Sequence, residues 1–281
     1  MGLFQFVFGR GYNLVRLGLL LILAGFGALP IWSPAAWAVE QAPLGIVLMH
    51  GKNGSPSSHI ANLAGSLERA GYLVMSPEMP WSHGHGYDRD YPTALAEIDQ
   101  AVAGLRARGA GRIIIAGHSI GANAALAYGA HRGGLAGIIA LAPGHAVQTS
   151  GFQKTTSDSV AKARAMIDEG KGEDFANFAD TNMGKSYSIS VSARIYFSYF
   201  DPNGLASMPQ SIAALPAELP LLCIGGKNDP GTERQDLPQM CGRNGSSGLD
   251  RYIEVDADHL GTPDAAEAVV LAWLKELAAK P

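Results

Sequence analysis

Three residues of the types needed for nucleophilic catalysis occur in separate parts of the chain: Ser119, Asp229 and His259. A serine hydroxyl is a weak nucleophile near neutral pH and needs a base within hydrogen-bond reach. An imidazole can be that base because it titrates at about pH 6.5. A carboxylate on the other ring nitrogen would orient the ring and stabilise the imidazolium that forms. We therefore predict that Ser119 is the nucleophile, His259 the general base and Asp229 the orienting acid.

The sequence around Ser119 predicts a sharp turn between a strand and a helix. Three isoleucines at 113–115 indicate a strand buried on both faces, and the Ala-rich segment after residue 121 favours a helix. Between them lies the pattern G-x-S-x-G, with glycines at 117 and 121. In a nucleophile elbow the strained turn raises the serine hydroxyl above the sheet edge, and small residues on either side prevent clashes between the crossing backbones.

Apolar strands and amphipathic helices alternate along most of the chain, which predicts βαβ units and a mainly parallel sheet. The expected strands cover residues 44–49, 72–75, 112–116, 137–141, 219–224 and 252–255. The expected helices include one from the Ser55-Pro56 pair to Gly71, one opened by Pro92, and a closing helix at 266–277. A long insertion at about 144–216 interrupts the alternation and predicts a lid over the carboxyl ends of the strands. Its aromatic residues at 196–200 could equally form the lid's own small core.

Ser119, Asp229 and His259 occur in the order nucleophile, acid, histidine, and each follows a predicted strand. In this order and context they resemble the catalytic triad of the α/β-hydrolase family, over nearly all of residues 44–279. The resemblance implies an α/β-hydrolase fold, with a mostly parallel central sheet, helices on both faces and catalysis at the carboxyl ends of the strands. Within the family, small secreted or dienelactone-hydrolase-like esterases are the nearest comparison. The insertion after Pro143 is longer than in the minimal members, so the resemblance does not supply a substrate.

The same resemblance implies an oxyanion hole built from main-chain N–H groups. Ile120 directly follows the nucleophile and would donate one hydrogen bond to the tetrahedral oxyanion. The pair His50-Gly51 looks like the family's oxyanion loop, and Lys52 is assigned as the second donor by its position there. We expect His118 to pack or hydrogen-bond beside the site, and we name it with Trp81 as candidate substrate-binding residues.

Several other residues compete for roles in the site. Asp256 and Asp258 are alternative acids, but they lie so close to His259 in sequence that orienting its ring would need a tight local return. His83 and His85, with Asp88, could suggest a metal, although this short loop offers no strong second set of ligands. We therefore expect neither a metal nor a cofactor.

Residues 1–38 differ in composition from the rest of the chain. Arg10 and Arg16 are the only charged residues in this segment, an apolar run covers 17–29, and Ala36 and Ala38 form an A-x-A pattern. These features predict a secretory signal peptide cleaved after Ala38, and hence a secreted or periplasmic catalytic domain at 39–281. The alternative is an uncleaved membrane anchor, because 17–32 is close to spanning length. No later stretch approaches that length.

The remaining composition limits the partners. The chain has 25 acidic and 21 basic residues and a formal net charge of −4, which argues against nucleic acid because such binding needs basic stripes. A small-molecule substrate is expected, and the sequence leaves the oligomeric state open. In an oxidising compartment, Cys223 and Cys241 would form a disulfide; the alternative is a buried thiol at Cys223 and an unrelated thiol at Cys241.

Three functions are consistent with these residues. The first is a serine hydrolase that cleaves carboxylic esters by acyl transfer to Ser119. The second is a peptidase or amidase with the same triad, which the sequence separates poorly from an esterase. The third is a noncatalytic binding protein that kept the fold.

Overall fold

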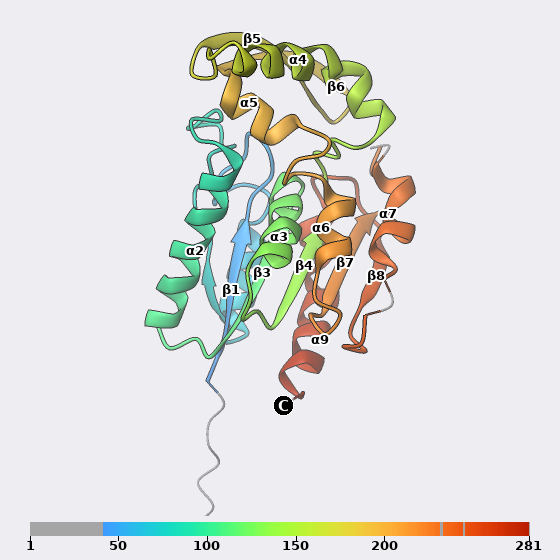
Figure 1. Ribbon diagram of the computed structural model, residues 1–281. Coiled ribbons are helices and arrows are strands. Elements are labelled where there is room, and N and C mark those ends of the chain that lie inside the picture. Colours follow the sequence, from blue (N-terminus) through green and yellow to red (C-terminus); the bar gives the residue numbers. More distant parts are fainter. Residues whose placement is uncertain (1–41, 231–232, 244, 281) are drawn as a thin grey trace, which may run out of the picture. The chain divides into compact units, whose positions relative to one another are not determined.

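A six-stranded sheet forms the centre of the protein (Figure 1). The structure is a computed structural model that describes residues 42–230, 233–243 and 245–280, without the side chains of 233–236. The predicted leader at 1–38 therefore lies outside the described residues. The strand order is β2-β1-β3-β4-β7-β8, and every neighbouring pair is parallel. The strands are β1 (Leu44–Met49), β2 (Leu73–Met75), β3 (Arg112–His118), β4 (Gly137–Leu141), β7 (Leu221–Gly226) and β8 (Arg251–Val255).

Helices cover both faces of this sheet, as its sequence predicts for strands that are apolar on both sides. Every residue of β1, β4 and β7 is buried. On one face lie α2 (Tyr91–Ala107), α3 (Ile120–His131), α6 (Met208–Ala214) and α7 (Glu233–Cys241). On the other lie α1 (Ala61–Arg69), α8 (Thr262–Ala265) and α9 (Glu267–Ala278). The predicted α/β-hydrolase fold is thus confirmed.

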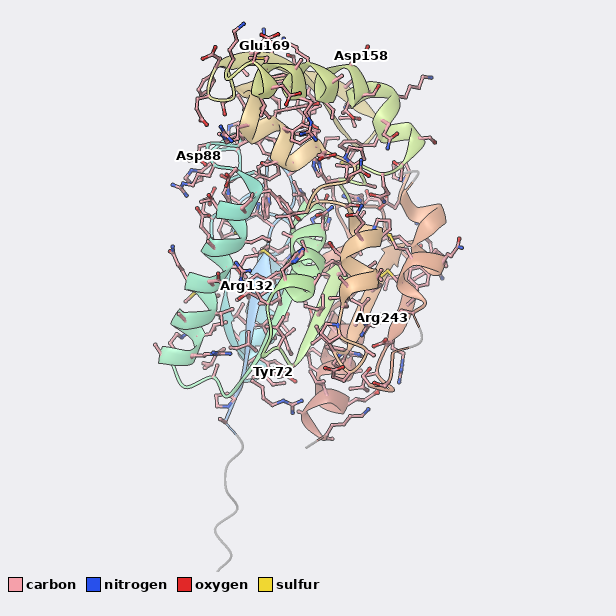
Figure 2. The ribbon with its side chains drawn as sticks, viewed as in Figure 1. Tyr72, Asp88, Arg132, Asp158, Glu169 and Arg243 are labelled. Carbon is pink, nitrogen blue, oxygen red and sulfur yellow. A yellow bond between two sulfur atoms is a disulfide. The ribbon has the colours of Figure 1, made fainter. Side chains whose placement is uncertain are left out.

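The insertion between β4 and β7 carries α4 (Ser150–Asp168), β5 (Phe175–Asn182), β6 (Lys185–Ser192) and α5 (Ala193–Phe200), followed by α6. β5 and β6 pair as an antiparallel hairpin with a tight turn at residues 183–184. Figure 1 shows α4, the hairpin and α5 above the carboxyl ends of the sheet strands. The outer surface of α4 is polar, and the exposed side chain of Asp158, like that of Glu169 just after the helix, lies there (Figure 2).

The aromatic residues of the insertion form its own core. Tyr196 stacks between Phe178 of β5 and Phe200, with ring centroids 4.4 and 4.1 Å apart. Tyr199 lies edge-on to Tyr87 and Tyr91, which belong to the body of the protein. The aromatic cluster thus holds the hairpin to α5 and also joins α5 to the body below it.

Two local expectations about this fold were wrong. The helix predicted to begin at Ser55-Pro56 begins only at Ala61, because Ser58 Oγ bonds both the carbonyl and the N–H of Ser55 and closes a separate turn. The hairpin was not predicted, since its Ser, Thr, Asn and Gly residues are also typical of loops. Among the described residues, no helix combines the length and the hydrophobicity needed to span a membrane.

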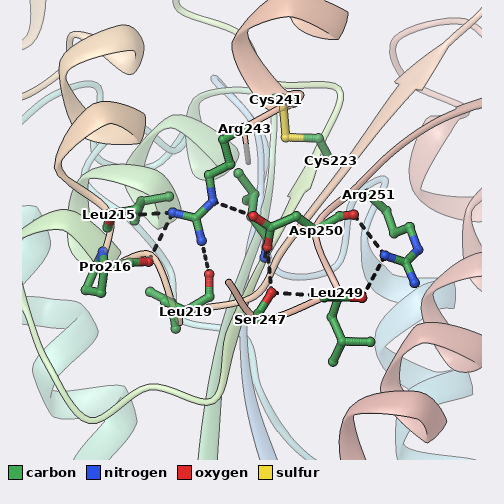
Figure 3. Close-up of polar contacts among 12 residues, drawn as sticks. Leu215, Pro216, Leu219, Cys223, Cys241, Arg243, Ser247, Leu249, Asp250 and Arg251 are labelled. Atoms are coloured by element: carbon green, nitrogen blue, oxygen red, sulfur yellow. Dashed lines mark hydrogen bonds and ion pairs between the residues drawn. A yellow bond between two sulfur atoms is a disulfide. The ribbon is translucent and has the colours of Figure 1, made fainter. Parts of the chain in front are cut away.

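Polar contacts fasten β7 and β8 at their amino ends (Figure 3). The Arg243 guanidinium donates to Asp250 Oδ2 at 2.8 Å and to the carbonyls of Pro216 and Leu219. The other oxygen of Asp250 accepts the Leu221 N–H at the start of β7. Arg243 and Asp250 are only 12% and 9% exposed, so each charge depends on the other for stabilisation.

Candidate active site

Ser119, His259 and Asp229 are linked by two hydrogen bonds at the carboxyl edge of the sheet. Ser119 Oγ lies 3.0 Å from His259 Nε2, and His259 Nδ1 lies 2.6 Å from Asp229 Oδ2. Ser119 follows β3, Asp229 follows β7 and His259 follows β8. The three side chains come from distant parts of the sequence and meet because parallel strands end at the same edge.

The turn at Ser119 explains the two glycines of the G-x-S-x-G pattern. Ser119 has φ 58° and ψ −120°, a strained conformation for a residue with a side chain. A Cβ on Gly117 would lie 2.2 Å from the carbonyl of Gly121, and one on Gly121 would lie 2.7 Å from the His50 carbonyl oxygen. The crossing of strand and helix therefore leaves no room for any side chain at either position.

Gly144 provides a third close approach, which the sequence analysis missed. It follows β4 on the loop that passes over the nucleophile, and a Cβ there would lie 2.8 Å from Ser119 Oγ. Its N–H donates to the Ser119 carbonyl at 3.2 Å. The only sequence signal was a glycine shortly after a predicted strand, and many loops share that feature.

The loop that carries His259 is fixed by its own hydrogen bonds, and these occupy the two alternative acids. Asp256 Oδ1 accepts from the Asn228 side chain at 3.0 Å, and Asp258 Oδ1 accepts the Gly261 N–H at 2.7 Å. The N–H of Asn228 also donates to the Ala257 carbonyl, which ties the Asp229 loop to the His259 loop. In this arrangement the carboxylate that reaches His259 is that of Asp229.

His118 supports the other side of this loop. Its Nε2 lies 2.8 Å from the His259 carbonyl oxygen, and its ring is 2% exposed. Because a carbonyl only accepts, His118 must carry its proton on Nε2. Burial, reinforced by the nearby His259, lowers the pKa of His118 to about 3, so the ring stays neutral at physiological pH. The structure thus places His118 beside the site, in contact with the main chain of His259.

The loop after β1 lies against the nucleophile and is held by Trp81. A Cβ on Gly51 would lie 3.1 Å from Ser119 Cβ. The fully buried Trp81 donates its indole N–H to the His50 carbonyl at 2.9 Å, and its own carbonyl accepts the Asn53 N–H. The side chain of Trp81 therefore braces the turn from behind.

Lys52 lies within this turn, and its side chain and main chain have different surroundings. The side chain is 3% exposed, whereas the residue as a whole is partly exposed, so its accessible part is main chain. Among the described residues, no hydrogen-bond acceptor faces the N–H of Lys52 or that of Ile120. Neither N–H is therefore taken by a protein acceptor, although Ile120 is fully buried whereas Lys52 is partly exposed.

A cavity of about 210 Å³ opens beside Ser119 and His259. The insertion forms its far wall, where hydroxyl and amide side chains predominate over the few apolar ones. These insertion residues include Phe152, Thr155, Thr181, Asn182, Met183 and Ser186. His118 and Trp81 are not among the residues that line this cavity.

His145 lies between the cavity and the insertion. It is buried, and its Nε2 lies 2.9 Å from the Tyr199 carbonyl oxygen. Burial, and then the nearby Lys52 ammonium, lower the pKa of His145 to about 3. The loop after β4 therefore presents a neutral imidazole to the insertion.

A disulfide joins Cys223 of β7 to Cys241 at the end of α7. Asp229 lies on the segment that it closes. No group of three or more His, Cys, Asp or Glu side chains in the described part of the chain is placed to hold a metal ion. His85 Nδ1 instead lies 2.7 Å from Asp88 Oδ2.

Comparison with solved structures shows the same fold in proteins of low identity. A monoacylglycerol lipase from Paleococcus ferrophilus is 19% identical, with a TM-score of 0.62 over 83% of this chain and 94% of the lipase. Est1E from Butyrivibrio proteoclasticus is 16% identical, with a TM-score of 0.57 over 86% and 90%. A thermostable carboxyl esterase from Bacillus coagulans is 14% identical, with a TM-score of 0.59 over 85% and 91%.

Sequence comparison gives the family. A search of curated proteins found no match. Residues 46–273, however, match the model of the alpha/beta hydrolase family, and this range contains the whole sheet from the third residue of β1 onward together with Ser119, Asp229 and His259. Because the match covers well over half of the chain, the protein belongs to the alpha/beta hydrolase family.

Proposed function

We propose that the protein is a serine hydrolase that cleaves carboxylic esters through an acyl-enzyme on Ser119. The observation that carries this proposal is the chain of hydrogen bonds from Ser119 Oγ through His259 to Asp229. Asp229 accepts the Nδ1 proton of His259, which leaves the lone pair of Nε2 directed at the serine hydroxyl. The hydroxyl can therefore lose its proton at the moment that it attacks.

In the acylation step, Ser119 Oγ bonds to the ester carbonyl carbon and its proton passes to His259 Nε2. The main-chain N–H groups of Ile120 and Lys52 stabilise the negative oxygen of the tetrahedral intermediate. The intermediate then collapses, the bond to the alcohol oxygen breaks, and His259 returns the proton to that oxygen. The alcohol leaves, and the acyl group stays on Ser119.

In the deacylation step, water takes the place of the alcohol. His259 Nε2 accepts a proton from the water as its oxygen attacks the acyl carbon, and the same two N–H groups bind the second oxyanion. Collapse breaks the bond to Ser119 Oγ, which regains its proton from His259. The product is a carboxylic acid, and no cofactor is consumed.

The cavity favours small and polar esters. Ligand pockets for drug-sized molecules usually measure about 300–1,000 Å³, so a cavity of about 210 Å³ admits a shorter molecule. Hydroxyl and amide groups on its far wall would pair with polar substituents, while a long alkyl chain would leave them without partners. The neighbouring structures include proteins named as esterases and lipases, which supports ester chemistry in general.

An active-site fluorophosphonate probe tests the proposal, since it labels an activated serine. We expect labelling of the wild-type protein and of Ser57→Ala, an exposed serine remote from the triad in sequence, but none of Ser119→Ala. Ester turnover should fall by several orders of magnitude in Ser119→Ala with the fold intact. Near-normal turnover by a clean Ser119→Ala preparation would disprove the assignment.

A substrate panel tests the specificity. Esters of graded acyl length should show the highest kcat/KM for short acyl groups, and matched peptide amides should be cleaved much more slowly. Faster cleavage of the amides would indicate a peptidase or amidase instead. The protein should be produced without residues 1–38, because the proposed leader is removed on export.

A further inference from the structure

A buried ion pair joins the turn after β1 to the hairpin of the insertion. Lys52 Nζ lies 2.6 Å from Asp180 Oδ1 and donates to the Thr181 carbonyl at 2.9 Å. The two charged side chains are 3% and 0% exposed. They are separated by 128 positions in the sequence, so the contact connects two segments that are distant along the chain.

Both charges have further partners. Asp180 Oδ2 accepts the Tyr187 hydroxyl at 2.8 Å from the opposite strand of the hairpin, and Oδ1 also accepts the Thr181 N–H. The Lys52 ammonium lies 5.8 and 5.7 Å from the ring centroids of Phe152 and Phe200. A pair surrounded in this way has one preferred geometry, because leaving either charge buried without its partner is costly.

The position of this pair matters for the proposed reaction. Trp81 anchors His50 and Asn53, the residues two before and one after Lys52, from the side of the protein body. The side chain of Lys52 anchors the same turn to the hairpin. The N–H of Lys52, which the proposed function uses as an oxyanion donor, lies between these two anchors.

We propose that Asp180 is a positioning residue for the oxyanion hole: through its ion pair with Lys52 it fixes the turn so that the Lys52 N–H meets the oxyanion. The hairpin is then part of the catalytic framework and does more than cover the cavity. This inference rests on the proposed function, since it needs an oxyanion at Ser119. A misplaced donor weakens binding of the transition state more than binding of the substrate, so its loss lowers kcat.

Three variants test this role: Asp180→Asn, Lys52→Met and the double variant. Lys52→Met keeps the main-chain N–H and removes the tether, but it leaves the buried Asp180 carboxylate without its cation. The double variant removes both charges, so no charge remains buried without a partner. Glu173→Gln is the matched control, because Glu173 pairs with Arg194 within the same insertion but both side chains are more than half exposed.

We expect kcat to fall about 10- to 100-fold in all three variants, with KM within about threefold of wild type; removing a whole oxyanion donor costs about 100- to 1,000-fold. A trifluoromethyl ketone forms a tetrahedral adduct with the serine. Its binding should weaken by the same factor by which kcat/KM falls. Inhibition by the carboxylic acid product should change little. The Glu173→Gln control should match wild type in all three measurements.

The double variant separates positioning from stability. If the ion pair only holds the insertion together, the double variant should regain both the melting temperature and kcat, because it contains no unpaired buried charge. Wild-type kcat in the double variant, or a loss confined to KM, would therefore overturn the proposal. The double variant remains interpretable even if the Asp180→Asn variant does not fold. Failure of the proposed function has a different signature, namely ester turnover that Ser119→Ala leaves unchanged.

Discussion

At the scale of single residues, two neighbouring imidazoles have different tasks because their hydrogen-bond partners differ. The rings of His118 and His259 lie 5.0 Å apart. His259 contacts a hydroxyl on one side and a carboxylate on the other, the partners that proton transfer requires. His118 contacts a carbonyl and is held neutral by burial, which lowers its pKa. A neutral His118 places no positive charge next to the imidazolium that the reaction forms on His259.

The same comparison of partners predicts the effect of changing each candidate acid. Asp229→Asn should lower ester turnover by about three to four orders of magnitude, because the amide would favour the wrong tautomer of His259. Asp256→Asn should have a much smaller effect, since Asp256 contacts the side chain of Asn228. Initial rates at saturating ester, measured on folded variants with matched circular dichroism, would show the difference. A larger loss in Asp256→Asn would reverse the assignment.

The triad residues were predictable from sequence because each is tied to a strand that is also predictable. Buried parallel strands give continuous apolar runs, and the residues just after them must meet at one edge of the sheet. Asp180 was not predictable in this way, because its partner lies 128 positions earlier and nothing near Asp180 signals a buried charge. Gly144 was missed for a similar reason: its constraint comes from Ser119 Oγ, which only the fold brings close.

At the scale of elements, the insertion was the part that sequence could predict least. Its length indicated a lid, and the structure places α4, the hairpin and α5 above the strand ends. β6 alternates between serines and the less exposed Tyr187, Ile189 and Val191, a strand signal that is easily missed in so serine-rich a segment. β5 alternates less clearly in sequence, and its Phe175 is 72% exposed. Contacts such as Phe178 against Tyr196 add to this pattern in stabilising the hairpin.

The link between β7 and α7 leads to a prediction about the disulfide. Cys223 and Cys241 are 18 positions apart, and closing a loop of that size removes unfolded-state freedom worth about 3 kcal/mol. Replacing both cysteines by alanine should therefore lower the melting temperature by about 6 to 12 °C in a domain of this size. Differential scanning fluorimetry with and without reductant would measure it, and only the wild type should respond to reductant.

The same prediction has an independent chemical check. If residues 1–38 export the chain, the cysteines meet an oxidising compartment. Intact-mass measurement after alkylation, without reduction, should then find no modified thiol in the exported protein. Two alkylated cysteines would contradict the disulfide and leave Cys223 as an ordinary core residue.

At the scale of the whole molecule, the buried imidazoles occupy the layer where the sheet meets the insertion. His50, His118 and His145 are all buried, and desolvation is the main cause that lowers the pKa of each. His50 Nε2 accepts the Met79 N–H, as a neutral ring can, and His145 Nε2 faces a carbonyl while its buried Nδ1 has no hydrogen-bond partner among the described residues. Protonation of any of these rings would place a buried positive charge between the sheet and the insertion.

These histidines predict that the fold loses stability in mild acid. The pKa values of His118 and His145 are lowered from 6.5 to about 3, so below pH 6.5 the unfolded chain binds protons that the folded chain does not. Their contribution is present above pH 6.5 and is lost as the pH falls toward 3, at about 1.4 kcal/mol per histidine for each pH unit. Chemical denaturation between pH 7 and 5 would measure the slope of the free energy of unfolding against pH, in a range where most carboxylates do not yet titrate. His118→Asn should reduce that slope by about one proton, whereas exchanging the exposed His131 for Gln should leave it unchanged. Equal slopes in all three proteins would show that His118 takes up its proton in the folded state as readily as in the unfolded chain.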